Sequence, residues 1–198
     1  MNDEVKKGPI VFLEGKTVLL RPLDKRSDAE KMQRWINDPE VRLNLATVFP
    51  QTLKNEEDFI DRCGEDTKSV VLAIVLKETG VFIGVMGLHD IDWPNRNATT
   101  GALIGEKQYW GKGYGTDAKM ILLNYVFNTL NLHTVSSSVI AFNKRSLGYS
   151  SHCGYKIDGV CRACIFREGR YWDRVMLSVM KKDWLPIWRK YQKTGSVC

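Results

Sequence analysis

The chain has 198 residues, 43% hydrophobic and 26% charged, which is the composition of an ordinary globular domain rather than of a disordered or fibrous protein. No apolar run reaches the roughly 18 residues of a membrane-spanning helix, and residues 1–15 lack the apolar core and cleavage site of a secretory signal peptide. The net charge of +6 indicates a solvated basic surface, part of which an anionic ligand could explain. We therefore expect one domain over residues 1–198, in the cytoplasm and not bound to a membrane.

The first half of the sequence predicts strands interrupted by two helices. A strand pair is expected around residues 14–16, followed by a helix at residues 27–36. Ser27 and Glu30 have capping-box spacing at its start, and the residue before Pro39 is forced out of the helical region at its end. The other elements predicted in this half are a helix at 55–63 and strands, rich in branched residues, at 69–76, 81–91 and 98–105.

The second half alternates between helix and strand, which predicts a mixed sheet with helices on both faces. The predicted elements are a helix from about 113, a strand at 133–141, a short helix at 143–154 and a hairpin of 155–166 with 171–180. An amphipathic tail follows at about 183–198, with Trp184, Trp188 and Tyr191 at helical spacing and Pro186 expected in its first turn. We expect this tail to pack on the protein itself or on a second copy in a homodimer, and to contribute no catalytic group.

The cysteines are odd in number, which favours free thiols in a reducing compartment. They are Cys63, Cys153, Cys161, Cys164 and Cys198. A zinc site built from the single CxxC and the nearby His152–Cys153 pair is the alternative. However, the CxxC falls in a predicted strand, where residues three apart face opposite sides. We therefore expect no metal.

Three glycines at alternate positions, Gly111, Gly113 and Gly115, stand directly before a long predicted helix. Glycines remove side chains from a loop, so its backbone can approach a ligand closely. The first N–H groups of the helix have no partner inside the helix and carry a partial positive charge, which suits this end to phosphate. Lys112 adds a full positive charge, and Thr116 adds a hydroxyl group in the first turn.

The glycine pattern differs from two known phosphate-binding loops. It lacks the GxxxxGK[ST] spacing of the P-loop. It also differs from the GxGxxG of a Rossmann dinucleotide site, because it reads GxGxG and follows four or five predicted strands, whereas the Rossmann glycines follow the first strand of the fold. Asp117 follows in the first turn, where the helix dipole favours an acidic residue, and we expect no phosphate contact from it. From spacing alone, a plain loop-to-helix junction remains the alternative.

The surrounding residues narrow the interpretation. The stretch "YWGKGYGTDA" resembles the pyrophosphate-binding loop of the GNAT acyltransferase superfamily, and "NKRSLGYSSHCGYKIDG" resembles its second signature, an N-x-x-S helix that ends in a Gly-aromatic pair. Over residues 17–181 the chain is similar to the ribosomal-protein-alanine acetyltransferase branch, which includes spermidine and antibiotic acetyltransferases. The stretches that carry this similarity are "LLRPLDKRSDAEKMQRWINDPEV", "GVMGLHDIDWPNRNATTGALIG" and "FREGRYWDRVMLSVM". The resemblance implies an α/β GNAT fold, with a mostly antiparallel mixed sheet of six to seven strands.

The resemblance also implies acetyl-CoA as cosubstrate. The loop backbone that would hold its pyrophosphate comprises Gly111, Lys112, Gly113, Tyr114, Gly115 and Thr116, after Trp110, where the family usually has Gln or Arg. Asn143 would contact the pantetheine arm or the adenylate side of CoA, and Ser146 would lie near its sulfur. The alternatives are an N-cap for Asn143 and an ordinary helix position for Ser146. The oxyanion contact would be a backbone N–H around Leu103, Ile104 and Gly105.

Acetyl transfer to an amine needs a neutral nitrogen, a polarised thioester carbonyl and a protonated leaving thiol, but no covalent nucleophile on the enzyme. Two proton-handling residues of related proteins are replaced here, by Ser150 and Ile165. His89 and Asp90 remain as candidates near the expected site, and a loop-facing polar position is the alternative for each. Weaker candidates are Asp92, Tyr149 and Ser151.

The sequence therefore predicts an acetyl-CoA-dependent N-acetyltransferase that acts on a primary amine of a small molecule or a protein N-terminus. Residues 35–59 and the "REGRYW" hairpin would form the acceptor side. A nucleic-acid or ribosome-binding module, suggested by the basic aromatic tail, is the rival reading, but no RNA-binding signature is found. A relative that binds acyl-CoA without catalysis is a further alternative.

Overall fold

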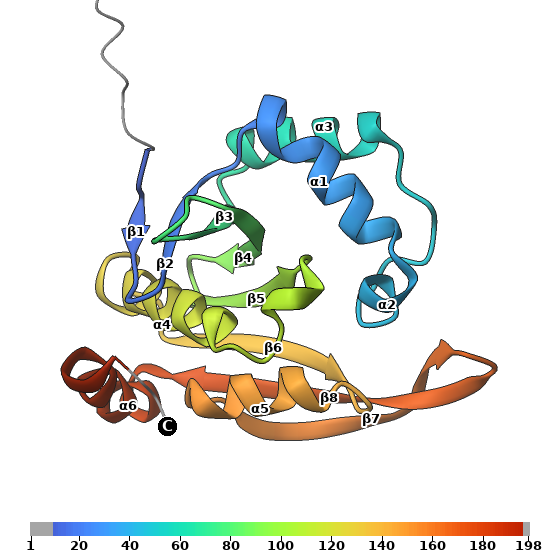
Figure 1. Ribbon diagram of the computed structural model, residues 1–198. Coiled ribbons are helices and arrows are strands. Elements are labelled where there is room, and N and C mark those ends of the chain that lie inside the picture. Colours follow the sequence, from blue (N-terminus) through green and yellow to red (C-terminus); the bar gives the residue numbers. More distant parts are fainter. Residues whose placement is uncertain (1–9, 196–198) are drawn as a thin grey trace, which may run out of the picture.

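An eight-stranded sheet forms the centre of the molecule (Figure 1). The computed structural model describes residues 10–195. The strand order is β1-β2-β3-β4-β5-β6-β8-β7, and the neighbouring pairs are antiparallel except β5 with β6. The strands are β1 (Leu13–Glu14), β2 (Val18–Pro22), β3 (Val70–Leu76), β4 (Phe82–Asp92), β5 (Asn97–Ile104), β6 (Thr134–Ile140), β7 (Lys156–Arg167) and β8 (Arg170–Met180). This confirms the mixed α/β fold, and the count exceeds six to seven because the two-residue β1 adds an edge strand.

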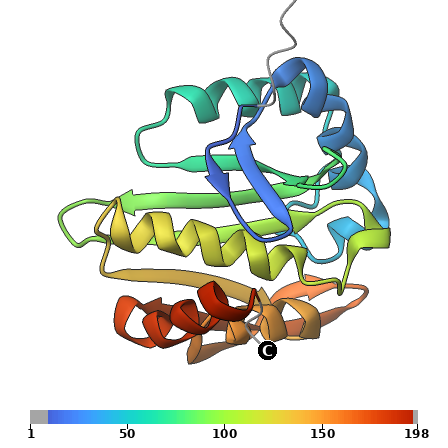
Figure 2. The same ribbon diagram turned by 60° about the vertical axis from the view of Figure 1, so that its left-hand side comes forward.

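Helices cover both faces of the sheet, as Figures 1 and 2 show. One face carries α1 (Lys25–Asn37), α2 (Pro39–Arg42) and α3 (Leu53–Glu65), and the other carries α4 (Tyr114–Asn128), α5 (Lys144–His152) and α6 (Lys181–Thr194); a 3₁₀ turn, η1, spans Lys107–Tyr109. β3 contributes side chains to the cores on both faces of the sheet. Its Ala73 and Val75 join the core under α1, whereas Leu72 and Ile74 join the core under α4. The continuous apolar run of this strand thus reflects burial on two sides.

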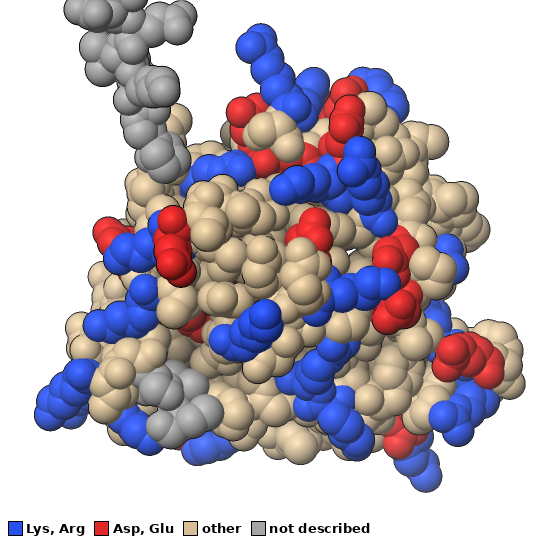
Figure 3. All heavy atoms as spheres, viewed as in Figure 1, with Lys and Arg blue, Asp and Glu red and all other residues tan. Residues whose placement is uncertain are grey.

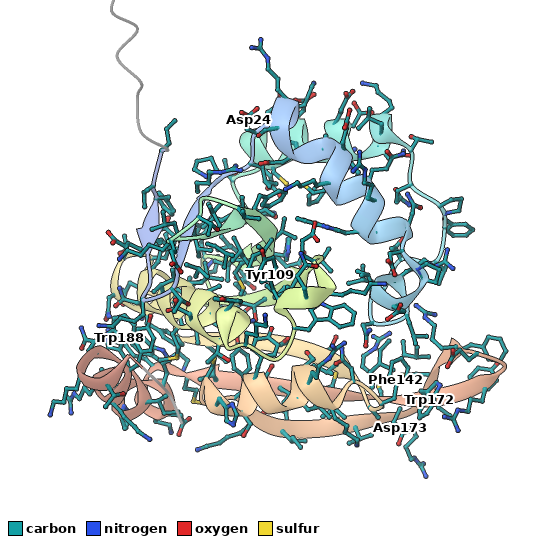
Figure 4. All side chains as sticks on the ribbon, viewed as in Figure 1. Asp24, Tyr109, Phe142, Trp172, Asp173 and Trp188 are labelled. Carbon is teal, nitrogen blue, oxygen red and sulfur yellow. The ribbon has the colours of Figure 1, made fainter. Side chains whose placement is uncertain are left out.

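The start of α1 differs from the prediction. Its N-cap is Asp24, whose side chain accepts a hydrogen bond from the Arg26 N–H at 2.9 Å (Figure 4). Ser27 already lies in the first turn, where its hydroxyl donates to Asp28 at 3.0 Å, so the expected capping box of Ser27 with Glu30 is wrong. A capping box does form at the start of α3, between Thr52 and Asn55.

The CxxC lies in β7, but the strand is irregular there. The register shifts between Cys161 and Ile165, and Ala163 has a φ of 47°. Cys161 and Cys164 are both exposed, as are most residues of this edge strand. Within residues 10–195 there is no group of three or more His, Cys, Asp or Glu residues that could hold a metal ion. The same part of the chain contains no helix long and apolar enough to cross a membrane.

The C-terminal helix α6 packs on its own chain, as expected for the tail. Trp184 is fully buried, 5.3 Å from the ring of Phe127, and Trp188 stacks between Trp184 and Tyr191. Because α6 begins at Lys181, Pro186 lies in the second turn, and its expected place in the first turn is wrong. Two regions fall outside the described residues: 1–9, where a signal peptide would lie, and 196–198, which hold Cys198 and the end of the tail.

Candidate active site

The sheet opens where β5 and β6 separate. These parallel strands pair only through Asn97–Thr99 and Thr134–Ser136 and then diverge. A cleft of about 1140 Å³ lies beyond that point. Its wall is formed by the end of β5, the glycine loop, the end of β6, the start of α5, residues 41–46 and parts of β7 and β8. Separating parallel strands leaves backbone groups unpaired within a sheet, and such groups need a partner.

The register of β5 decides which of its backbone groups face the cleft. The Gly105 N–H donates to Ile83 on β4 at 2.9 Å, and hydrogen-bonding direction alternates along an antiparallel strand. The Ile104 carbonyl accordingly points away from β4 and accepts the indole N–H of Trp110 at 2.6 Å. The same alternation turns the N–H groups of Ala102 and Ile104 toward the cleft. It turns the Leu103 amide toward β4, where the Gly105 N–H is also bonded, so Ile104 is the best placed of the three predicted oxyanion contacts.

The glycine loop opens onto this cleft at the start of α4. Gly113 is the N-cap, with a φ of 85°, and Gly111 has a φ of 73°, a left-handed conformation that side chains disfavour. No atom lies within 4 Å of the position that a Cβ would take at either residue. The first N–H groups of α4 and Lys112 therefore border open space, which is the arrangement that a bound phosphate requires.

Two residues near the glycine loop, Trp110 and Arg145, stack on each other, and Trp110 is also hydrogen-bonded to β5. Trp110, which replaces the usual Gln or Arg, is held by its bond to Ile104, and the Arg145 guanidinium lies 3.8 Å from its ring centroid. Arg145 and Lys144 lie in the first turn of α5 and line the cleft, as Lys112 does. The wall near the glycine loop is therefore cationic.

Asn143 and Ser146 both line the cleft, and they contact each other. The side-chain oxygen of Asn143 accepts the Ser146 N–H at 3.0 Å, so Asn143 is the N-cap of α5. Capping uses one lone pair of this oxygen and leaves the side-chain NH₂ group to serve a ligand. Tyr149 lines the same wall, and burial raises the pKa of its hydroxyl.

Asp117 makes contacts that sequence reasoning missed. It lies in the first turn of α4 as expected, but its carboxylate accepts the backbone N–H groups of Lys16, Thr17 and Val18 at 3.1, 2.6 and 3.0 Å. It also accepts the hydroxyls of Thr17 and of Tyr191. Five hydrogen bonds therefore converge on this one carboxylate.

The two predicted proton acceptors do not line the main cleft. His89 lies beside α3, and burial lowers the pKa of its imidazole despite Asp90 and Asp66 nearby. Its Nε2 is 3.8 Å from the Cβ position of Gly101, and Gly101 does line the cleft. Asp90 is exposed, with a φ of 52°. The weaker candidate Asp92 caps a turn by accepting the backbone and side-chain N–H groups of Asn95 at 3.0 and 2.8 Å.

A buried lysine behind the cleft is a second feature that sequence reasoning missed. Lys119 of α4 is fully buried, and its ammonium group donates to the Thr100 hydroxyl at 2.7 Å. The rings of Tyr149 and Tyr155 lie 5.5 and 5.3 Å from it. Because burial disfavours the charged ammonium group, it lowers the pKa of Lys119 from 10.5 to about 8. Thr100 lines the cleft and also bonds the Tyr155 hydroxyl, so the network reaches the site.

Comparison with known proteins identifies the family. The model of the acetyltransferase (GNAT) domain matches residues 17–156. N-acetyltransferase p20 of Bacillus licheniformis is 27% identical over 160 residues, covering 79% of this chain and 89% of that protein. The spermidine N(1)-acetyltransferase of Escherichia coli is 22% identical over 181 residues, covering 85% and 89%. The Vibrio cholerae spermidine N-acetyltransferase, solved with CoA and spermine, has the same fold, with a TM-score of 0.78 at 21% identity over 85% of this chain and 98% of that one. The chain therefore belongs to the GNAT acetyltransferase family.

Proposed function

We propose that this protein transfers the acetyl group of acetyl-CoA to a primary amine by direct attack, the amine belonging to a small molecule or a protein N-terminus. The observation that carries the proposal is the position of the α4 N-terminus. Its glycine loop opens onto the cleft left by the separation of β5 and β6. A pyrophosphate and a thioester can then bind in one continuous site.

The cleft wall fits acetyl-CoA along its length. The backbone of residues 111–116 and Lys112 would hold the pyrophosphate, because this helix end presents free N–H groups beside a cation. The Ala102 and Ile104 amides would accompany the pantetheine arm and the thioester along β5. On the opposite wall, Asn143 and Ser146 would meet the arm near its sulfur.

The chemistry assigns three roles to residues of the wall. The Ile104 N–H would donate to the oxyanion that forms when the amine attacks the carbonyl. The Ser146 hydroxyl would protonate the departing thiolate. The proton of the amine would pass to His89, whose lowered pKa leaves the imidazole neutral near pH 7 and which stands behind Gly101, where no side chain blocks the wall. Asp90 would assist only through its charge on His89.

The direct test is release of free thiol from acetyl-CoA in the presence of a panel of amines. Because one relative is named for spermidine, the panel includes it beside amino acids, peptides and amino sugars. We expect thiol release that depends on an amine, and a melting temperature raised by CoA but not by RNA. A protein that CoA does not stabilise would contradict the proposal. Stabilisation by CoA without thiol release from any amine would leave an acyl-CoA-binding protein.

A further inference from the structure

One arm of the cleft lies away from the glycine loop and faces α2. It is bounded by residues 41–46, by residues 164–167 of β7 and by Arg174 of β8, and we call it the acceptor arm. Figure 1 shows the far end of the β7–β8 hairpin beneath α2. Arg167 joins the two sides, since its guanidinium donates to the carbonyls of Leu45 and Ala46 at 3.0 and 3.2 Å. The arm is therefore a bounded space.

The acceptor arm contains positive charge that no carboxylate of the described residues neutralises. Arg167 donates only to backbone carbonyls. Arg174 is half-buried and lines the cleft, and within residues 10–195 its guanidinium has neither a hydrogen bond nor an ion pair. A half-buried guanidinium has five N–H donors and no acceptor, so an unpaired one favours an anionic oxygen group.

The surrounding residues provide no counter-charge. Within residues 10–195, Asp117 is the one acidic residue in the cleft wall, and five donors already occupy it at the loop end. Glu40 of α2 pairs with Lys107 at 2.8 Å, and Glu168 lies in the exposed turn of the hairpin. Figure 3 shows Lys and Arg side chains gathered around α5 on the side of the molecule that it views.

A second donor lies on the same strand face as Arg174. Trp172 is two residues away, so its side chain shares that face. Its ring centroid lies 4.9 Å from that of Phe142, and Figure 4 labels these two side chains near each other. Its buried indole N–H has no partner within residues 10–195. On this face the strand thus presents N–H donors and no carboxylate, because Asp173, between the two, projects from the opposite face, where it accepts the Ala163 N–H at 2.9 Å. A polyamine, which is a row of cations, would meet like charge there.

We propose that the acceptor is a primary amine whose own molecule carries an anionic oxygen group, a carboxylate or a phosphate, which the Arg174 guanidinium binds. This inference rests on the proposed function and specifies its substrate class. The anionic group binds in the acceptor arm, and the amine reaches the thioester at the end of β5. Arg174 is an acceptor-binding residue in this scheme and takes no part in proton transfer.

The test uses matched amines that differ only in the anionic group. The pairs are glucosamine 6-phosphate with glucosamine, and a glutamyl dipeptide with its glutaminyl counterpart, the dipeptides having amidated C-termini; spermidine is assayed beside them. We expect the anionic member of at least one pair to have a kcat/KM about tenfold higher than its neutral partner or more. Arg174→Gln should abolish that ratio without changing the melting temperature or the CoA affinity. Arg162→Gln, an equal charge change at an exposed position of the same hairpin, should preserve it.

Acetylation in which neutral amines or spermidine are preferred would overturn the proposal while leaving acetyl transfer intact. So would a ratio that survives Arg174→Gln. If no amine of the panel is acetylated, the proposed anion site is tested by ligand binding alone. Succinate or inorganic phosphate should further raise the melting temperature of the wild-type protein and of Arg162→Gln in saturating CoA, but not that of Arg174→Gln. The absence of any such rise in the wild type would overturn the inference, whereas failure of CoA itself to bind would instead remove the proposed function.

Discussion

Gly113 determines the backbone at the start of α4. A valine there would meet a left-handed φ of 85°, at a cost of about 1–2 kcal/mol, and its branches would enter the open space above the loop. We predict that Gly113→Val lowers CoA affinity at least tenfold, measured by calorimetry on folded protein. Gly169→Val is the matched control, because Gly169 has a φ of 75° and equally open space but lies in the hairpin turn. Equal CoA affinity in both variants would refute the assignment.

Ser146 is assigned to protonate the thiolate. Ser146→Ala keeps the backbone N–H that Asn143 caps, so α5 should remain intact. We predict that the change lowers kcat more than it weakens CoA binding, because a leaving-group proton matters only in the transition state. Turnover and CoA affinity are measured together on the variant. If the two fall equally, or if neither changes, Ser146 has no part in the reaction.

Lys119 makes stability depend on pH. Its folded pKa of about 8 lies below its ordinary value of 10.5, so between these pH values the unfolded chain binds more protons and stability rises with pH. We predict that Lys119→Met, which leaves the bond of Thr100 to Tyr155, is more stable than wild type by on the order of 3 kcal/mol below pH 8. Denaturant unfolding at a series of pH values should show this difference decline toward pH 10.5. A difference that does not change with pH would mean that Lys119 does not titrate there.

At the scale of elements, α6 closes the apolar core rather than the reaction site. Trp184 is fully buried against Phe127, whereas Trp93 is 47% exposed. We predict that Trp184→Ala lowers the free energy of unfolding by about 3–5 kcal/mol, and that the control Trp93→Ala lowers it by less than about 1 kcal/mol. Acetyl transfer per folded molecule should be kept in both variants. Full stability with lost transfer in Trp184→Ala would place α6 in the acceptor site.

At the scale of the whole molecule, the basic balance should affect CoA binding through long-range attraction. The net charge is +6, and Lys112, Lys144 and Arg145 line the cleft beside the glycine loop. We predict that the CoA dissociation constant rises several-fold between roughly 50 and 500 mM salt, because the Debye length falls from about 14 Å to about 4 Å. Stopped-flow mixing should assign most of the change to the association rate. Lys112→Gln should reduce the salt dependence, and a wild-type affinity independent of salt would contradict the prediction.

The parts of the fold that depend on local pattern were predictable. The unbroken apolar run of β3 and the glycine loop before α4 both predicted the elements that form there. The bulge in β7 was not, because it depends on a left-handed residue at Ala163, which nothing in the neighbouring sequence requires. The start of α1 was misplaced because Asp24 and Ser27 are both acceptable caps, and the Asp28 carboxylate, which accepts the Asp24 N–H at 2.8 Å, supports the earlier one.

The site was predictable only where its residues are close in sequence. Residues 110–116 form a continuous loop, so their place in the cleft wall could be predicted from one stretch. The surroundings of Lys119 were not, since α4 is apolar on nearly all sides and its pattern does not show which face meets Thr100. The contacts of Asp117 could not be predicted because its donors are about a hundred residues earlier in the chain, or 74 residues later. The cationic acceptor arm likewise joins β7, β8 and the segment after α2.

The contacts of Asp117 have a consequence for synthesis of the protein. The turn before β2 and the hydroxyl of Tyr191 meet on this one carboxylate, so the two ends of the fold converge at the end of α4 that carries the glycine loop. The chain is synthesised from its N-terminus, and Tyr191 is therefore the last of these donors to be made. A chain that ends before α6 has the glycine loop but lacks the hydrogen bond from Tyr191 to Asp117. We therefore expect prematurely terminated copies to bind the proposed cosubstrate, acetyl-CoA, more weakly than the full chain does, even when most of the sheet has formed.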